Sequence, residues 1–192
     1  ICNSNTRGRN YFMKFIKTQL EGAYIIKLKK IEDERGFFTR VWDKNIFAEN
    51  GINSELLQIS FSQSKKKGTL RGMHFQKNPF EESKLVRCTQ GKIFDVIIDL
   101  RKESSTYKKW INIELSSDNL QALYIPEGFA HGFQTLEDNC EVCYHMSNWF
   151  SPEHAKGIRY DDDEFKIKWP IITPIISKKD LSYQKEEYIR EV

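Results

Sequence analysis

The sequence has 192 residues, of which 39% are hydrophobic and 30% are charged, and this length and composition predict one domain with a substantial core. Thirty lysines and arginines against 27 aspartates and glutamates lack the basic excess that is typical of a nucleic-acid-binding protein. No apolar stretch reaches the roughly 18–20 residues that span a bilayer, so a cytoplasmic protein with neither a nucleic-acid nor a membrane partner is expected. The mostly polar residues 1–12 are expected to form a flexible extension to one domain over residues 13–192.

Short apolar segments separated by turn signals predict a mainly β protein. Many short strands with closely spaced turns are typical of a sandwich, a jelly roll or a small barrel. A few short helices are expected, one at residues 43–49 and one in the charged C-terminal tail at residues 181–191. The strand at residues 58–62 alternates, with Ile59 and Phe61 on one face and polar side chains on the other. The expected strands are residues 23–28, 58–62, 84–89, 92–100, 110–115, 122–125, 132–136 and 141–146.

One pair of these strands predicts a β-hairpin. Residues 84–89 and 92–100 flank the turn residues Gln90-Gly91, and a short glycine-containing connection is typical of such a hairpin. The apolar side of its second arm is formed by Phe94, Val96, Ile98 and Leu100.

Two of the four cysteines, Cys140 and Cys143, form a CxxC motif. A four-ligand zinc site needs a second pair of ligands at a suitable spacing, and the sequence has no clear one. Redox CxxC pairs open a helix, whereas Cys143 lies in an expected strand. These cysteines are therefore expected to be plain thiols, buried or at the surface.

Two segments concentrate polar chemistry. Residues 68–76 bring Arg71, His74 and Gln76 together beside glycines that permit close backbone approach, and a later turn delivers His131 onto a following strand. These segments resemble the two signature segments of the cupin superfamily, which implies a jelly-roll β-barrel with both histidines pointing inwards. Metal-binding cupins usually carry an HxH triplet, but here the triplet ends in Gln76, so no metal is expected.

A more specific resemblance comes from seven short motifs in order along the chain. They are RGFF (35–38), LRGMH (70–74), KLVRC (84–88), DVIIDLR (95–101), IPEGFAHGF (125–133), IKWP (167–170) and ISKKD (176–180). In this order they resemble the dTDP-4-dehydrorhamnose 3,5-epimerase family of nucleotide-sugar epimerases, over nearly all of residues 13–180. The resemblance implies a homodimeric isomerase that uses no cofactor. Its expected substrate is a nucleotide-linked 4-keto-6-deoxy sugar, with dTDP as the first choice of nucleotide. The expected product is a sugar used in a surface glycan.

The resemblance also implies a catalytic set. The C4 ketone of such a sugar acidifies the protons at C3 and C5, so epimerisation needs a base, an acid on the opposite face and stabilisation of an enolate. His74 is the expected base and Asp180 orients it, while Tyr144 is the expected acid. Lys84, with Arg71 nearby, is expected to stabilise the enolate oxygen or to hold the sugar.

Substrate-binding residues follow from the same resemblance. Positive or donor positions of the family are matched by Arg35, Arg71, His131 and Lys179, and guanidinium groups suit a diphosphate because they pair with its oxygens. Phe38 is expected to stack on the nucleotide base, and Gln58 matches a further binding position. Exchange of an N-terminal segment within the homodimer would bring Arg35 and Phe38 into the neighbour's site.

Four positions depart from the family pattern: Arg40 replaces a glutamate, Ser60 an asparagine, Phe150 a tyrosine and Ala155 an acidic residue. Ser60 and Phe150 remain expected substrate contacts, and the catalytic set is retained. The departures therefore predict the same chemistry with altered recognition of the nucleotide, of the sugar, or of C3 alone against both C3 and C5. The change to Phe150 is the most suggestive of the four, because loss of the tyrosine hydroxyl can remove a proton donor or a sugar contact.

Three other functions stay open at this point. A nucleotide-sugar 3,4-ketoisomerase shares the enolate chemistry, although the sequence keeps the epimerase set. A non-catalytic sugar-binding cupin has no need of an opposed acid and base, so the presence of Tyr144 and Asp180 argues against it. A metal-dependent cupin oxygenase would be recognised by elemental analysis of the purified protein.

Overall fold

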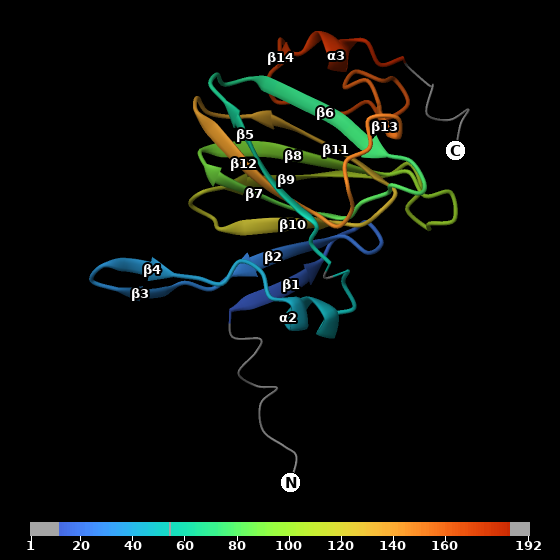
Figure 1. Ribbon diagram of the computed structural model, residues 1–192. Helices are drawn as coiled ribbons and strands as arrows, with labels where there is room; N and C mark the ends of the chain where they lie inside the picture. The colour runs from blue at the N-terminus through green and yellow to red at the C-terminus, as the bar shows by residue number, and fades with distance from the viewer. Residues whose placement is uncertain (1–11, 54, 185–192) are drawn as a thin grey trace.

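Nearly all regular structure in the chain is β-strand, and the computed structural model describes residues 12–53 and 55–184 (Figure 1). The strands are β1 (Met13–Lys17), β2 (Tyr24–Leu28), β3 (Ile31–Asp33), β4 (Gly36–Phe38), β5 (Gln58–Ser64), β6 (Thr69–Gln76), β7 (Lys84–Gln90), β8 (Lys92–Asp99), β9 (Trp110–Ser116), β10 (Gln121–Ile125), β11 (Phe129–Thr135), β12 (Cys140–Met146), β13 (Ala155–Gly157) and β14 (Ile175–Ile176). Two short helices lie within the described ranges, α2 (Lys44–Glu49) and α3 (Lys178–Leu181).

The strands form two main sheets that pack against each other. One sheet has the order β1-β2-β10-β7-β12-β5 and the other β13-β6-β11-β8-β9, with β14 running parallel beside β6. The core between them draws on both sheets, with Val86 and Leu123 from the first and Ile97 and Phe133 from the second. The sequence prediction of a mainly β, cupin-type jelly roll with a few short helices is therefore confirmed.

The predicted hairpin of residues 84–89 and 92–100 is wrong, although both strands exist. β7 pairs with β10 and β12, whereas β8 pairs with β9 and β11, so the two strands belong to different sheets. Gly91, with φ of +76°, carries the chain from one sheet to the other, and a Cβ there would lie 2.7 Å from the Cys140 Sγ. The turn at Gly91 therefore joins β7 in one sheet to β8 in the other and crosses the edge of the core. This arrangement lets both strands bury their apolar residues between the sheets.

The alternation in β5 is present, but its apolar face is the outer one. Ile59 and Phe61 are 60% and 64% exposed, while Ser62, on the opposite face, lines a cavity in the jelly roll. β5 is the last strand in the order of its sheet and pairs with β12. The hydrophobic pattern thus identifies the strand, and the packing decides which face meets the core.

The remaining sequence predictions divide into three groups. The other expected strands are all present, with β11 beginning three residues early at Phe129. The strands β1, β3, β4, β6, β13 and β14 were not predicted. The helix expected at residues 43–49 is α2, where the Asp43 side chain accepts hydrogen bonds from two backbone N–H groups and caps the first turn. In the C-terminal tail α3 ends where the predicted helix begins, and residues 182–184 are not helical. Residues 185–192 and the N-terminal residues 1–11 lie outside the described ranges.

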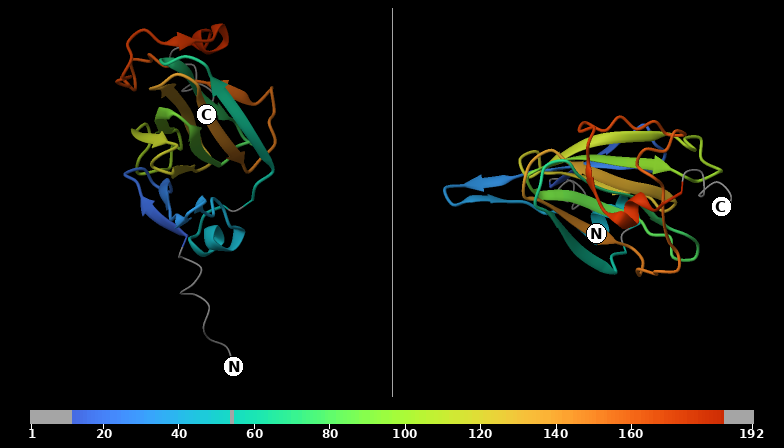
Figure 2. Two further views of the ribbon diagram at one scale, coloured as in Figure 1. Left: turned by 90° about the vertical axis from the view of Figure 1, so that its left-hand side faces the viewer. Right: turned by 90° about the horizontal axis from the view of Figure 1, so that it is seen from above.

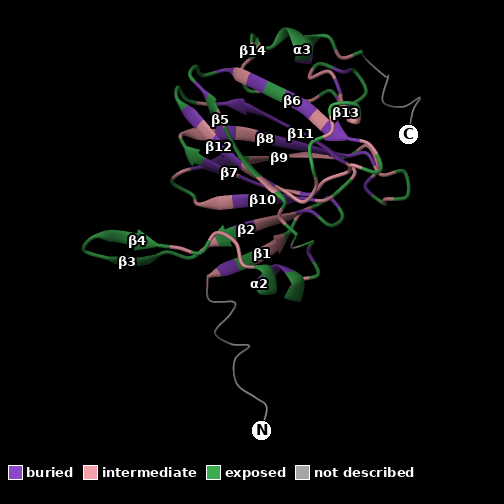
Figure 3. Ribbon diagram, viewed as in Figure 1, coloured by how far each residue is buried: buried purple, intermediate pink, exposed green. Residues whose placement is uncertain are grey.

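The β3–β4 hairpin projects away from the two main sheets (Figure 2). Its residues are exposed throughout (Figure 3), including the aromatic Phe37 and Phe38 at 50% and 59% exposure. At its base, α2 buries Ile46 and Phe47 against the first sheet. Among the residues described, no helix is long and apolar enough to cross a bilayer. The thiols of the described cysteines, Cys88, Cys140 and Cys143, are free and buried, as predicted for the CxxC pair.

Candidate active site

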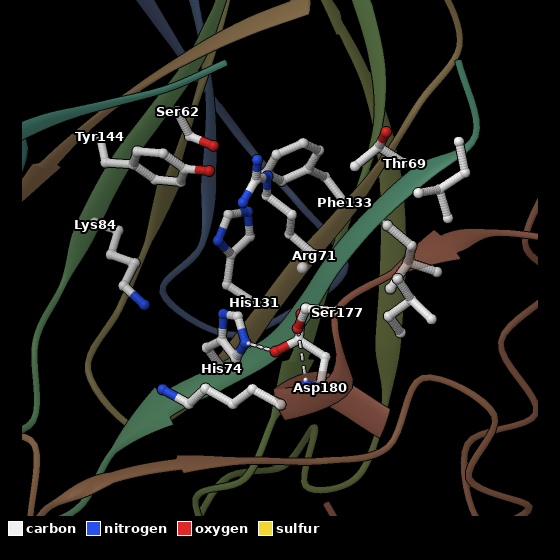
Figure 4. Close-up of a pocket in the computed structure, with 15 residues that line it drawn as sticks. Ser62, Thr69, Arg71, His74, Lys84, His131, Phe133, Tyr144, Ser177 and Asp180 are labelled. Atoms are coloured by element: carbon white, nitrogen blue, oxygen red, sulfur yellow. Dashed lines mark hydrogen bonds and ion pairs between the residues drawn. The ribbon is translucent and has the colours of Figure 1, made fainter. Parts of the chain in front are cut away.

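A cavity of about 570 Å³ opens among β6, β7, β11, β12 and the C-terminal segment that contains β14 and α3 (Figure 4). Its walls carry most of the side chains that the sequence singles out. These are Arg71, His74, Lys84, His131, Tyr144, Lys179 and Asp180. The two histidines lie on paired strands, with His74 of β6 opposite His131 of β11 in the register. The predicted inward orientation of both histidines is confirmed.

His74 and Asp180 come together although 106 positions separate them in the sequence. The Ser177 side chain caps α3 by accepting a hydrogen bond from the Asp180 N–H, and this turn points the Asp180 carboxylate at β6. Its Oδ1 lies 2.8 Å from Nε2 of His74, and its Oδ2 accepts a long bond of 3.4 Å from the Gly72 N–H. Asp180 is buried and His74 is half-exposed, so the imidazole is oriented from the protein side and open on the cavity side.

The charge state of Asp180 suits this role. Burial alone would raise its pKa, but the hydrogen bond and the charge of His74, followed by the bonds from Gly72 and Ser177, bring the pKa below its ordinary value. Asp180 is therefore a carboxylate at neutral pH, and it accepts the proton on Nε2 of His74. Nδ1 of the same ring then keeps its lone pair, which is what a base needs.

A second histidine–aspartate pair lies deeper in the site, and the sequence analysis missed its carboxylate. Both oxygens of Asp95 are 3.0 Å from Nε2 of His131, and both side chains are buried. Burial raises the pKa of Asp95, which His131 and then Lys84 oppose. The available signal was a carboxylate in the middle of the largely apolar strand β8, between Phe94 and Val96, where an unpaired charge is costly.

Tyr144 projects from β12 into the same cavity. Its ring meets those of His131 and Phe133 at centroid distances of 6.1 and 6.5 Å, and its hydroxyl points toward the Ser62 side chain (Figure 4). Burial, followed by the charge of Asp95, raises the pKa of Tyr144 well above its ordinary value, and the nearby Ser62 hydroxyl offsets only part of this effect. The phenol therefore holds its proton at neutral pH and can act as a donor.

Two cations complete the cavity. Lys84 is only 11% exposed and forms an ion pair of 3.1 Å with the carboxylate of Glu82. The Arg71 guanidinium donates to the Ser64 hydroxyl and the Gln63 carbonyl, at 3.2 and 3.0 Å. Within the described part of the chain, no group of three or more His, Cys, Asp or Glu side chains could hold a metal ion.

Five predicted contacts lie outside this cavity: Arg35, Phe38, Gln58, Ser60 and Phe150. Arg35, whose side chain is 82% exposed, pairs with Asp33 on the projecting hairpin, and Phe38 lies on the same hairpin. Gln58 accepts a hydrogen bond of 2.8 Å from the Phe150 N–H, while Ser60 is exposed and pairs with Tyr144 in the strand register. Within one chain, the hairpin residues are therefore not part of the site.

The departures from the family pattern also have defined positions. Phe150 and Ala155 line a smaller adjoining cavity of about 200 Å³, whose walls share His74, Lys84 and Lys179 with the larger one. Arg40 lies away from both cavities and pairs with Asp43 at 3.2 Å, at the start of α2. Two of the four departures, Phe150 and Ala155, thus lie beside the candidate base.

Comparisons with known proteins agree with this geometry. A protein-family model described as dTDP-4-dehydrorhamnose 3,5-epimerase matches residues 17–187. The dTDP-4-dehydrorhamnose 3,5-epimerase of Shigella flexneri is 42% identical over 174 residues, which cover 90% of this chain and 96% of that protein. The protein of the same name from Methanothermobacter thermautotrophicus is 44% identical over 174 residues, covering 89% of this chain and 93% of its own.

A solved structure extends the likeness to three dimensions. The crystal structure of dTDP-4-dehydrorhamnose 3,5-epimerase from Bacillus anthracis, with TDP and PPi bound, matches with a TM-score of 0.88 at 41% identity. The match covers 90% of this chain and 99% of that one. By sequence and by fold, this chain belongs to the dTDP-4-dehydrorhamnose 3,5-epimerase family.

Proposed function

We propose that this chain is an epimerase that inverts C3, C5 or both in a dTDP-linked 4-keto-6-deoxy sugar, without a cofactor. The observation that carries the proposal is the pairing of His74 with Asp180, 2.8 Å apart, in one cavity with the protonated Tyr144. A base and an acid on separate walls can act on opposite faces of a sugar ring. A protein that only binds the sugar has no need of this arrangement.

The reaction starts with proton removal by His74. Nδ1 takes the proton from C3 or C5 of the sugar, and the electron pair of that C–H bond moves through the adjacent carbon to the C4 oxygen. An enolate forms, and the imidazolium is stabilised by the Asp180 carboxylate. No electron is lost or gained overall, because the C4 carbonyl of the substrate accepts the pair and later returns it.

Reprotonation from the other face completes the inversion. The Tyr144 hydroxyl gives its proton to the same carbon, the C4 carbonyl re-forms, and the tyrosinate is then reprotonated from solvent while His74 releases its proton. The Lys84 ammonium group, enclosed with Glu82, offers a positive charge to the enolate oxygen. Arg71 and Lys179 at the wall of the cavity suit the diphosphate.

The working form of the enzyme is proposed to be a homodimer in which the β3–β4 hairpin of each copy reaches the other copy's cavity. The hairpin carries Arg35 and Phe38, both exposed, far from the cavity of their own chain, and it also exposes Ile31 and Phe37. Exposed apolar side chains on a projecting hairpin are typical of an interaction surface.

Mixed subunits test this arrangement. A His74→Ala chain and an Arg35→Ala chain are each inactive or nearly so, but hybrids contain one intact site. Refolding them together in equal amounts should restore about a quarter of wild-type activity, because half of the dimers are hybrids with one working site of two. No recovery, or an active monomer in solution, would contradict the exchange of hairpins.

The activity itself is tested by proton NMR in D2O with dTDP-4-keto-6-deoxyglucose, with His74→Ala as the control. Deuterium entering both C3 and C5 supports the 3,5-epimerase, and deuterium at C3 alone supports a 3-epimerase. A product with its carbonyl at C3 identifies a ketoisomerase instead. No exchange with any dTDP-, GDP- or CDP-linked 4-keto sugar would overturn the proposal.

A further inference from the structure

The chain beyond α3 folds back against the second sheet and places Tyr183 beside the candidate base. The Tyr183 ring lies edge-on to His74, with centroids 6.0 Å apart and an angle of 69° between the ring planes. It also rests directly on Gly157 of β13, where a Cβ would come within 2.2–2.5 Å of three atoms of the Tyr183 ring. The bare backbone of Gly157 thus leaves the space that the ring fills.

We propose that Tyr183 is a positioning residue, which holds α3 against β6 and thereby keeps Asp180 in its hydrogen bond with His74. The proposal rests on the function proposed above, because it concerns the base of that reaction. It adds a role for the segment after the catalytic aspartate, which none of the seven sequence motifs includes.

The helix that carries Asp180 is too short to hold its own position. α3 has four residues, whereas isolated helices of fewer than about 12 residues are marginal even with favourable sequences. Its orientation must therefore come from contacts outside the helix. At its N-terminus the Ser177 side chain caps the first turn, and β14, which ends just before Ser177, attaches this end to β6.

Two contacts attach its C-terminal end. The Arg159 Nη1 donates a hydrogen bond of 2.8 Å to the carbonyl of Leu181, and Arg159 is itself held by Asp161 at 2.8 Å. The Tyr183 ring on Gly157 is the second contact. Gly157 and His74 are directly opposite in the pairing of β13 with β6, so Tyr183 is anchored at the residue of β13 that lies next to the base.

The ring also gives His74 a second contact besides Asp180. The His74 side chain is 42% exposed, and an imidazole bonded at one nitrogen can still swing about that bond. Asp180 contacts the imidazole through a hydrogen bond, and Tyr183 contacts it through its ring. Burial and the charge of Asp180 raise the pKa of Tyr183, so a neutral ring stands beside the dyad and adds no competing charge.

A double-mutant cycle tests the contact. Tyr183→Ala removes the ring, and Gly157→Ala leaves the ring but pushes it out of its place. Each should lower kcat about 10- to 100-fold, the size expected when a reacting group is misplaced by about 1 Å. The double variant should be no worse than Tyr183→Ala alone, because the added methyl group then meets no ring.

The pH profile of activity distinguishes a loss of Asp180 positioning from a general loosening of the structure. When Asp180 drifts from His74 the imidazolium loses its partner, so the acid limb of kcat/KM should move to lower pH. Tyr183→Phe keeps the ring, so its kcat and the acid limb of its pH profile should be those of the wild type. Tyr107→Ala, a tyrosine in the loop between β8 and β9, is the matched control and should change neither. KM is measured separately, because Tyr183 also lines the smaller cavity.

A measurement without substrate keeps the two proposals apart. The proton on Nε2 of His74, bonded to Asp180, should give a downfield resonance in the free wild-type protein, identified by its absence in His74→Ala. It should broaden or shift in Tyr183→Ala and in Gly157→Ala. An unchanged resonance together with unchanged kcat and pH profile in Tyr183→Ala would overturn the positioning role. Failure of the wild type to exchange substrate protons would overturn the epimerase alone.

Discussion

The Asp95 carboxylate holds both of its oxygens 3.0 Å from Nε2 of His131, and the two side chains are no more than 5% exposed. The pair lies on the second sheet, across the cavity from Tyr144 of the first sheet, whose ring is 6.1 Å from that of His131. Its position suggests that Asp95 sets the orientation of His131 in the way that Asp180 sets that of His74. The site thus contains two histidine–aspartate pairs, of which only one faces the solvent side of the cavity.

The Asp95→Asn variant tests the inner pair. The amide keeps the shape of the carboxylate but loses its charge, so His131 should no longer be held as a charge-assisted donor. We expect kcat/KM to fall about 10- to 100-fold, the loss of about 1.4–2.7 kcal/mol of transition-state stabilisation. Because burial already disfavours the charge of Asp95, the melting temperature should hardly fall. A large loss of stability with normal turnover would contradict this role.

The Tyr144→Phe variant separates proton removal from proton return. His74 can still take the proton and give back a solvent deuteron on the same face, so exchange should continue without inversion. Net epimerisation should fall about 10²- to 10⁴-fold, as for loss of a general acid. NMR in D2O measures both rates in one sample. Equal losses of exchange and inversion would mean that Tyr144 is not the acid.

The Asp180→Asn variant should show a pH-dependent stability difference from the wild type. The pKa of Asp180 is lowered in the folded protein, so its charged form contributes stability above the unfolded-state pKa of about 3.9. That contribution is lost as pH falls below about 4, through the lower pKa of the folded state. Urea unfolding at pH 7, 5 and 3.5 should find wild type more stable at the first two values and the gap closing at the third. A constant gap would contradict the ion pair.

Gly132→Ala should destabilise the junction of β6 and β11. A Cβ on Gly132 would lie 2.6 Å from the Met73 Sδ, 2.8 Å from the Arg71 carbonyl oxygen and 3.1 Å from the Gly72 Cα. Backbone atoms cannot yield as a side chain does, so we expect a loss of about 1–3 kcal/mol in the free energy of unfolding. Denaturant titration measures it. Activity should fall too, because β11 carries His131 and pairs with β6 where His74 lies.

The buried thiols should resist alkylation. Burial raises the pKa of Cys88 to about 12, and only the thiolate reacts, so at pH 8 the folded protein should not be labelled at this position by iodoacetamide. Cys140 and Cys143 are also buried and should likewise need unfolding. Peptide mass spectrometry after labelling, with and without urea, distinguishes the sites. Fast labelling of Cys88 in the folded protein would contradict its burial.

The sequence alone predicted eight of the strands that the structure describes. Its short motifs also indicated the two histidines of the cavity and the candidate base, acid and lysine, because all of these depend on local patterns. The tertiary structure decided what depends on contacts between distant segments. It placed β7 and β8 in different sheets, since each has apolar residues to bury across the core.

The same distinction explains the site. Asp95 stands between apolar residues of β8, and only the pairing of β8 with β11 brings it to His131. The alternation of β5 could not say which face meets the core, because the pattern is the same for both, and packing turned Ile59 and Phe61 outward. Tyr183 lies outside every motif, yet the fold sets it on Gly157, beside His74. The local sequence pattern therefore indicates strands and the side chains that can do chemistry. The burial of apolar surface between distant segments determines which of these side chains meet.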